Sequence, residues 1–145
     1  MTVVLKAQDV HSFYGKSHIL HGVSLEVNEG EIVAVLGRNG AGKTTTVRSL
    51  MGLTPARMGK IEIFGQDTTR WPTHRVAGLG VGYVPEGRKI FGNLSVLENL
   101  QVPKARPGPW TLDRVFSLFP RLAERRGQLG RQLSGGEQEM LAIAR

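Results

Sequence analysis

Five consecutive apolar residues, Ile32–Leu36, lead directly into a glycine-rich loop, and this junction restricts the folds open to the chain. A segment that is apolar at every position is typical of a strand covered on both faces, as in a parallel sheet flanked by helices. The loop itself, Gly37–Thr44, fits the pattern G-x-x-x-x-G-K-[ST]. A helix is expected to follow it, from about Lys43 to Met51. The sequence therefore predicts an α/β fold built around a strand, a loop and a helix.

Each residue type in this loop suits the binding of phosphate groups. Glycines allow backbone conformations that turn successive N–H groups inward and form a concave anion site, and the helix N-terminus adds a partial positive charge. Lys43 supplies a full positive charge to the β- and γ-phosphates, and the Thr44 hydroxyl is placed to coordinate Mg²⁺. The alternative, a chance match on a glycine-rich turn, does not explain the flanking strand and helix. We predict ATP and Mg²⁺ as ligands, bound by Gly37, Arg38, Asn39, Gly40, Ala41, Gly42, Lys43, Thr44 and Thr45.

The composition argues against several other classes of protein. The chain has 145 residues, enough for one domain, and no Cys, so neither disulfides nor thiolate metal sites are available. The net charge of +7 comes from scattered basic residues, whereas a nucleic-acid interface needs a patch or stripe. The N-terminus lacks the features of a signal peptide, and Ile32–Leu36 is far shorter than the ~20 residues that span a bilayer. We expect a soluble chain that binds no nucleic acid and reaches a membrane only through a partner.

Hydrophobic spacing and turn residues predict the remaining elements. A short helix is expected to start at Pro72 and end near Gly80. The proline-rich segment 103–109 is incompatible with a helix or a central strand. Beyond it, apolar residues recur at helical spacing, with Pro120 kinking or restarting that helix, and another helix opens around Gly135. Strands are expected at residues 3–10, 23–27, 60–64 and 81–84, and His11, His18, His21 and His74 are interpreted as surface or loop residues.

A second glycine turn, Ser134-Gly135-Gly136-Glu137, opens the last predicted helix. Ser134 is a good N-cap residue, and Glu137 lies at capping-box spacing from it. The two glycines let a ligand approach bare backbone closely. A plain capped helix start remains the alternative interpretation of this turn alone.

Together, GRNGAGKT and LSGGEQ resemble the Walker A and signature motifs of ABC ATPases. The resemblance implies an α/β P-loop NTPase core with an antiparallel β part and a helical subdomain. Residues 1–145 would form an ABC ATP-binding domain, with a nucleotide-binding core at 1–86 and a helical subdomain at 87–145. In this family two domains pair head to tail, so the signature residues act on ATP held by the P-loop of the partner. Those residues are Ser134, Gly135, Gly136 and Glu137.

The same resemblance assigns two further positions. Tyr14 matches the aromatic residue that stacks on adenine, although a tyrosine at the surface or on an edge strand is the simpler interpretation without the family. Glu86 stands at the Q-loop position, where the family usually has Gln. A carboxylate there can ligate Mg²⁺, but it also brings negative charge near the γ-phosphate.

Longer stretches resemble one ATP-binding subunit of the branched-chain amino acid importers, whose close relatives serve urea and short-chain amides. They are GYVPEGRKIF, LSVLENL, LFPRL, ERR and MLAIAR. The resemblance implies coupling of ATP hydrolysis to transport at the cytoplasmic face of the membrane. The partners implied are a second ABC ATPase subunit, membrane permease subunits and a periplasmic or extracellular substrate-binding protein.

The Walker B aspartate, the adjoining catalytic glutamate and the switch histidine of this family follow the signature helix, and none is present here up to Arg145. We therefore expect the domain to be C-terminally incomplete, to contain no catalytic residue and not to hydrolyse ATP alone. Two alternatives remain. One is a soluble ABC ATPase that acts on nucleic acid or ribosomes, and the other is a non-hydrolysing nucleotide-binding fragment.

Overall fold

The computed structural model describes residues 1–103 and 106–145, so Lys104 and Ala105 of the predicted proline-rich loop lie outside the described residues. The chain divides into two compact units, Met1–Tyr83 and Val84–Arg145. This division falls close to the predicted boundary between residues 86 and 87. Within the described residues, no helix has the length and apolar character needed to cross a membrane.

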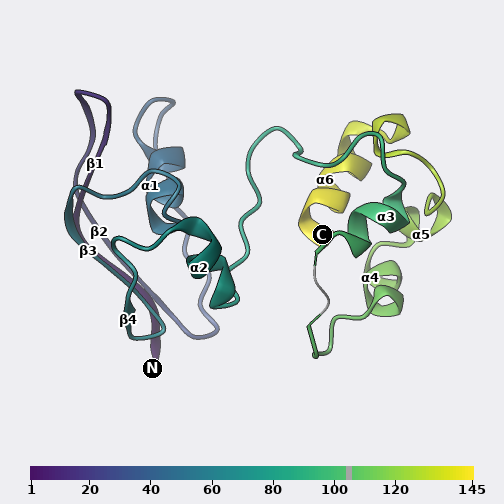
Figure 1. The fold of residues 1–145 in the computed structure, drawn as a ribbon, viewed down its shortest axis with the longest axis horizontal. Coiled ribbons are helices and arrows are strands. Elements are labelled where there is room, and N and C mark those ends of the chain that lie inside the picture. Colours follow the sequence, from purple (N-terminus) through teal and green to yellow (C-terminus); the bar gives the residue numbers. More distant parts are fainter. Residues whose placement is uncertain (104–105) are drawn as a thin grey trace. The chain divides into compact units, whose positions relative to one another are not determined.

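The first unit contains an antiparallel sheet with the strand order β2-β1-β3-β4 (Figure 1). The predicted strands at 3–10 and 23–27 are present but longer than expected, because they form one continuous hairpin that turns at Gly15, whose φ is +59°. The strand predicted at 60–64 is also confirmed. The bounds are Val3–Tyr14 for β1, Ser17–Asn28 for β2, Met58–Ile63 for β3 and Gln66–Asp67 for β4.

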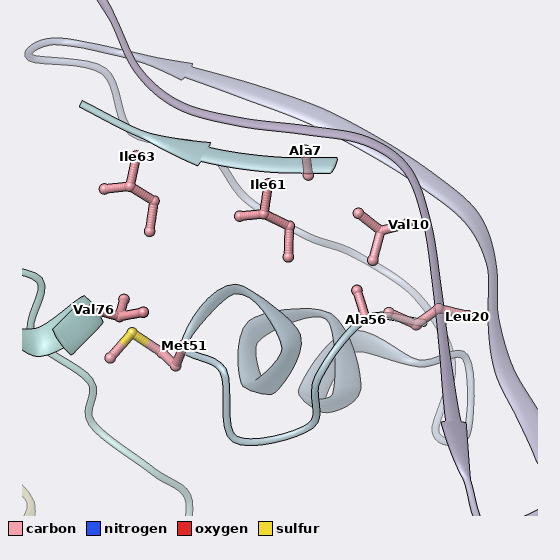
Figure 2. Close-up of a cluster of buried hydrophobic side chains, with 8 residues drawn as sticks. All are labelled: Ala7, Val10, Leu20, Met51, Ala56, Ile61, Ile63 and Val76. Atoms are coloured by element: carbon pink, nitrogen blue, oxygen red, sulfur yellow. The ribbon is translucent and has the colours of Figure 1, made fainter. Parts of the chain in front are cut away.

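Two helices, α1 (Lys43–Leu50) and α2 (Thr73–Gly78), cover one face of this sheet, close to where the sequence predicts them. Ile61 and Ile63 point from β3 into the space between the sheet and the helices (Figure 2). The buried cluster comprises Ala7, Val10, Leu20, Met51, Ala56, Ile61, Ile63 and Val76. A hydrogen bond of 2.8 Å between the buried hydroxyls of Ser12 and Ser49 also ties β1 to α1.

Two predicted strands are wrong. Ile32–Leu36 is not a strand, and the side chains of Ile32 and Leu36 are 96% and 90% exposed rather than covered on both faces. A strand exists only through hydrogen bonds to a neighbour, and no described strand of the antiparallel sheet pairs with this segment. Residues 81–84 are likewise not a strand; Val81 and Tyr83 instead pack against the buried cluster of the first unit.

The histidines were also only partly predicted. His21 and His74 are exposed, as expected, but His11 and His18 are half-buried and lie in strands β1 and β2 rather than in loops. The cause is the greater length of the hairpin. It aligns His11 opposite His21, and Phe13 opposite His18.

The second unit is helical. Pro120 ends one helix and begins the next, because it occupies the first turn of α5, where its missing N–H is not needed. The buried cluster here is Val96, Phe116, Leu122, Leu133 and Leu141. The elements are α3 (Val96–Gln101), α4 (Leu112–Leu118), α5 (Pro120–Glu124), the short 3₁₀ helix η1 (Gly130–Gln132) and α6 (Gly135–Ala144).

Helix α3 was not predicted, although its start carries a recognisable signal. The Ser95 hydroxyl accepts a hydrogen bond from the Glu98 N–H at 3.1 Å, and the Glu98 carboxylate accepts one from the Ser95 N–H at 2.7 Å. Asn99 is fully buried one turn later, and its amide bonds the backbone of Phe91, Leu94 and Ser95. These contacts fix the entrance to α3 against the preceding loop.

Candidate nucleotide-binding site

The P-loop turns at two glycines before it enters α1. Gly40 and Gly42 have φ values of +82° and +95°, a region that residues with a side chain rarely adopt. Gly42 is the N-cap of α1 and packs so closely on the hairpin that a Cβ there would lie 2.9 Å from Leu20. Between them, the Ala41 N–H donates to the Arg38 carbonyl at 3.1 Å and closes a tight turn. The loop therefore depends on glycine at positions 40 and 42 for its backbone conformation.

The Lys43 ammonium is held inside this loop. Its Nζ donates to the carbonyl oxygen of Gly37 at 2.6 Å and to that of Arg38 at 2.9 Å. An ammonium group has three N–H donors, so these two bonds leave one for an anion. The lysine is thus fixed at the start of α1, where the helix dipole adds to its positive charge.

The three threonines after Lys43 have different surroundings. Thr44 is exposed, so its hydroxyl is available to a metal ion. Thr45 is buried, and its hydroxyl donates to the Tyr14 oxygen at 3.5 Å. The Thr46 hydroxyl donates back to the Gly42 carbonyl at 2.9 Å. Thr44 and Thr45 were both predicted to bind the nucleotide. The exposed Thr44 hydroxyl suits Mg²⁺ coordination, whereas the Thr45 hydroxyl is hydrogen-bonded to Tyr14.

A Mg²⁺ ion fits this site only as a companion of phosphate. Among the residues that the structure describes, no three carboxylate, histidine or cysteine side chains are grouped to hold a metal ion. Mg²⁺ commonly keeps several waters and combines one or two protein oxygens with substrate phosphates. The exposed Thr44 hydroxyl supplies such an oxygen at the first turn of α1.

Tyr14, the last residue of β1, is 47% exposed and tethered through its hydroxyl. Its oxygen accepts hydrogen bonds from the Thr45 and Thr54 hydroxyls, both at 3.5 Å. These bonds, that of Thr45 first, lower the pKa of Tyr14, and the nearby Arg48 charge acts in the same direction. The ring therefore stands beside the first turn of α1. Thr54 could not have been found from the sequence, because no local pattern connects it with Tyr14.

The signature turn has the predicted capping box. The Ser134 hydroxyl accepts from the Glu137 N–H at 3.3 Å, and the Glu137 carboxylate accepts from the Ser134 N–H at 3.1 Å. Glu137 is only 8% exposed, and its other oxygen lies 2.9 Å from Nε of Arg125. The carboxylate of Glu137 is therefore engaged within its own unit. The backbone at Gly135 and Gly136 remains the part of the turn that a ligand can approach.

Glu86, at the predicted Q-loop position, is exposed. It lines an open cavity of about 520 Å³ together with Gly87, Arg88, Gln138 and Glu139. The structure thus brings Glu86 to the side of helix α6, within the second unit. Arg88 was not among the predicted site residues, and nothing in the local sequence pattern distinguishes it.

Comparisons with known proteins agree with these motifs. Residues 20–145 match the family model described as ABC transporter. The chain is 42% identical, over 98% of its length, to the high-affinity branched-chain amino acid transport ATP-binding protein BraG of Pseudomonas aeruginosa. It is 38% identical, over 97% of its length, to the lipopolysaccharide export system ATP-binding protein LptB of Escherichia coli K12.

Solved structures show the same fold. A nucleotide-free ATP-binding cassette from an ABC transporter superposes over 99% of the chain with a TM-score of 0.83, at 22% identity, and 64% of its own length is covered. A dimeric bacterial ABC transporter cassette superposes over 97% of the chain with a TM-score of 0.78, at 26% identity and with 67% of its length covered. The likeness confirms the predicted α/β class with an antiparallel sheet and helices.

The chain spans 63% of the length of BraG and 61% of that of LptB. The family match nevertheless includes both the phosphate loop and the glycine turn of α6. With a family match over residues 20–145 and relatives of this identity, the chain belongs to the ABC transporter ATP-binding family.

Proposed function

We propose that this chain binds ATP with Mg²⁺ at Gly37–Thr45 and forms part of an ATPase subunit that drives transport. The observation that carries the proposal is the conformation of the loop. Gly40 and Gly42 adopt left-handed conformations, and the lysine is fixed at the start of α1. Phosphate is the ligand that a helix N-terminus with a fixed cation favours.

In this proposal each site residue has its own role. Lys43 would neutralise charge on the β- and γ-phosphates, and the Thr44 hydroxyl would hold Mg²⁺, which would supply further positive charge to the phosphates. Tyr14 offers its exposed ring to adenine. Ser134, Gly135 and Gly136 of one copy face the γ-phosphate bound by a second copy, and Glu137 keeps their turn in shape through Ser134 and Arg125.

The test of ATP binding is a titration with Lys43→Ala. Removing this charge deletes a charge-assisted contact, which is worth about 1.5–3 kcal/mol, so affinity should fall about tenfold or more. Lys6→Ala is the matched control, because Lys6 lies on β1 and pairs with Glu26 at 3.5 Å. Equal affinities for the Lys43 variant and the unchanged chain would contradict the proposal.

For the transported substrate we propose branched-chain amino acids or related amides. The chain would act at the cytoplasmic face of the membrane on permease subunits, which receive substrate from a periplasmic or extracellular substrate-binding protein. The support is the 42% identity to BraG, together with the run GYVPEGRKIF. The 38% identity to LptB makes lipopolysaccharide export the second candidate.

These two candidates differ in what stimulates hydrolysis. The full-length protein, reconstituted with its permease in vesicles, should hydrolyse ATP faster with an amino-acid-loaded binding protein than with an empty one. Stimulation by lipopolysaccharide, with no response to amino acids, would favour the second candidate.

A further inference from the structure

Arg57, which directly precedes strand β3, contacts the turn that carries Tyr14. Its Nη2 donates a hydrogen bond to the Gly15 carbonyl at 2.7 Å, and its Cζ lies 4.6 Å from the centroid of the Phe13 ring. Phe13 and Gly15 flank Tyr14 in the sequence. One guanidinium therefore contacts the chain on both sides of this tyrosine, although Arg57 is 42 residues away from Gly15.

The turn itself is exposed and lightly packed. Tyr14 pairs with Ser17 across the hairpin, which leaves Gly15 and Lys16 as a two-residue connection. A Cβ built on Gly15 would meet no atom of the described residues within 4 Å. The two hydrogen bonds to the Tyr14 hydroxyl are both 3.5 Å long, which is beyond the usual range for hydroxyl donors. The 2.7 Å bond from Arg57 is therefore a stronger restraint on this turn than the bonds to the hydroxyl.

The segment that contains Arg57 is itself fixed. The Arg57 N–H donates to the His11 carbonyl at 2.9 Å, which joins this residue to β1. Three residues earlier, Thr54 is buried, donates to the Tyr14 hydroxyl and accepts a hydrogen bond from Nε of Arg48 at 3.3 Å. Residues 54–57 thus hold Tyr14 from two directions, at its hydroxyl through Thr54 and at its neighbours in the chain through Arg57.

An arginine suits both contacts of position 57. Its planar guanidinium donates N–H groups within the plane and offers its face to an aromatic ring, whereas a lysine has a compact ammonium group. The Phe13 ring is also stacked on His18 of β2, with centroids 4.2 Å apart and an interplanar angle of 6°. Phe13 therefore gives the guanidinium a well-positioned surface.

We infer that Arg57 is a positioning residue for adenine. It holds the Phe13–Gly15 segment so that the exposed Tyr14 ring is already oriented when a nucleotide arrives, and it acts through Tyr14 without contacting the phosphates. This inference rests on the proposed function, since the orientation of the ring affects binding only if Tyr14 stacks on the base. A ring that is held in place before binding loses less conformational freedom when the base stacks on it.

The experiment is calorimetric titration of the full-length protein with ATP and, separately, with inorganic triphosphate. Arg57→Ala should weaken the binding of ATP about fivefold, the low end of the loss expected when a base loses its aromatic partner. The affinity for triphosphate should stay unchanged, and Arg57→Lys should lie between Arg57→Ala and the unchanged protein for ATP. Arg70→Ala is the matched control, because it removes the same charge from the exposed lining of the cavity that Arg57 also lines. It should change neither affinity.

A double-mutant cycle shows whether Arg57 acts through Tyr14. Arg57→Ala should weaken ATP binding in the unchanged protein but add little in Tyr14→Ala, because the ring that it positions is then absent. The inference is overturned if the two losses add, if Arg57→Ala binds ATP as tightly as the unchanged protein, or if it loses affinity for ATP and triphosphate equally. That last result would assign Arg57 to the phosphates or to folding. The Lys43→Ala titration tests the proposed P-loop function separately, because Lys43 affects both ligands whereas Arg57 should affect only ATP.

Discussion

The Tyr14 hydroxyl accepts a hydrogen bond from the hydroxyl of Thr45, the third residue of helix α1, at 3.5 Å. This contact connects the end of the first strand with the first turn of the helix that follows the phosphate loop. It leaves the ring 47% exposed while fixing its hydroxyl end. An exposed aromatic ring anchored beside the proposed phosphate site is suited to stacking on a base.

Replacing Tyr14 by Ala should therefore weaken the binding of ATP but leave the binding of inorganic triphosphate nearly unchanged. Stacking of a base on an aromatic side chain is worth about 1–3 kcal/mol, which corresponds to a loss of about fivefold to a hundredfold. Tyr14→Phe is the control, because it keeps the ring and removes only the hydrogen bonds of Thr45 and Thr54. Isothermal titration with both ligands measures the difference. Equal losses for the two ligands would assign Tyr14 a role in folding instead.

Glu86→Gln in the full-length protein should change the dependence on Mg²⁺ more than the affinity for nucleotide. The carboxylate is exposed in its cavity and acidic, so it can attract the metal ion or repel the γ-phosphate. The uncharged amide attracts the metal ion less strongly and does not repel the phosphate. The measurement is ATP binding and hydrolysis over a range of Mg²⁺ concentrations. Glu139→Gln is the control, since it removes a charge from the same cavity on helix α6. Superimposable metal titrations for Glu86→Gln and the unchanged protein would exclude this role.

Glu137→Gln should destabilise the second unit by about 1–3 kcal/mol, the usual cost of leaving a buried polar group without its partner. The carboxylate is 8% exposed and connects Ser134 with Arg125, so its loss leaves the arginine without its anion. Glu98→Gln is the matched control, because Glu98 forms the same capping box with Ser95 at an exposed site. Urea unfolding should show a smaller loss of unfolding free energy for Glu98→Gln than for Glu137→Gln. Equal losses in the two variants would mean that the Glu137–Arg125 pair does not contribute to stability.

How far the sequence predicted the structure depended on whether the signal was local. The P-loop, helix α1, the restart at Pro120 and the Ser134–Glu137 capping box all follow from residues within a few positions of one another. Helix α3 begins with the same kind of local signal, the Ser95–Glu98 capping box. Ile32–Leu36 shows the limit, because its pattern specifies a strand only when neighbouring strands pair with it. The contacts of Tyr14 with Thr54 and of Arg88 with Gly135 join residues far apart in sequence, so no local pattern predicts them.

The histidines of the β1–β2 hairpin should make its stability depend on pH. Nδ1 of His11 and Nε2 of His18 share a hydrogen bond of 3.0 Å, the rings of His18 and His21 lie 3.9 Å apart, and Asp9 contacts His11 at 3.2 Å. Partial burial, followed by the neighbouring charge of His21, lowers the pKa of His18. The hydrogen bond between His11 and His18 also needs an acceptor nitrogen that carries no proton. Protonation of both rings therefore removes it.

Because the folded-state pKa of His18 lies below its unfolded value of about 6.5, the neutral ring is favoured in the fold. The resulting stability is fully present above about pH 6.5 and is lost as pH falls through the lower, folded-state pKa. Urea unfolding at a series of pH values below neutrality should therefore show a falling midpoint, and His18→Gln should flatten that slope. His74→Gln, at an exposed position of helix α2, should retain it. An acid slope that persists unchanged in His18→Gln would show that the hairpin histidines do not titrate with folding.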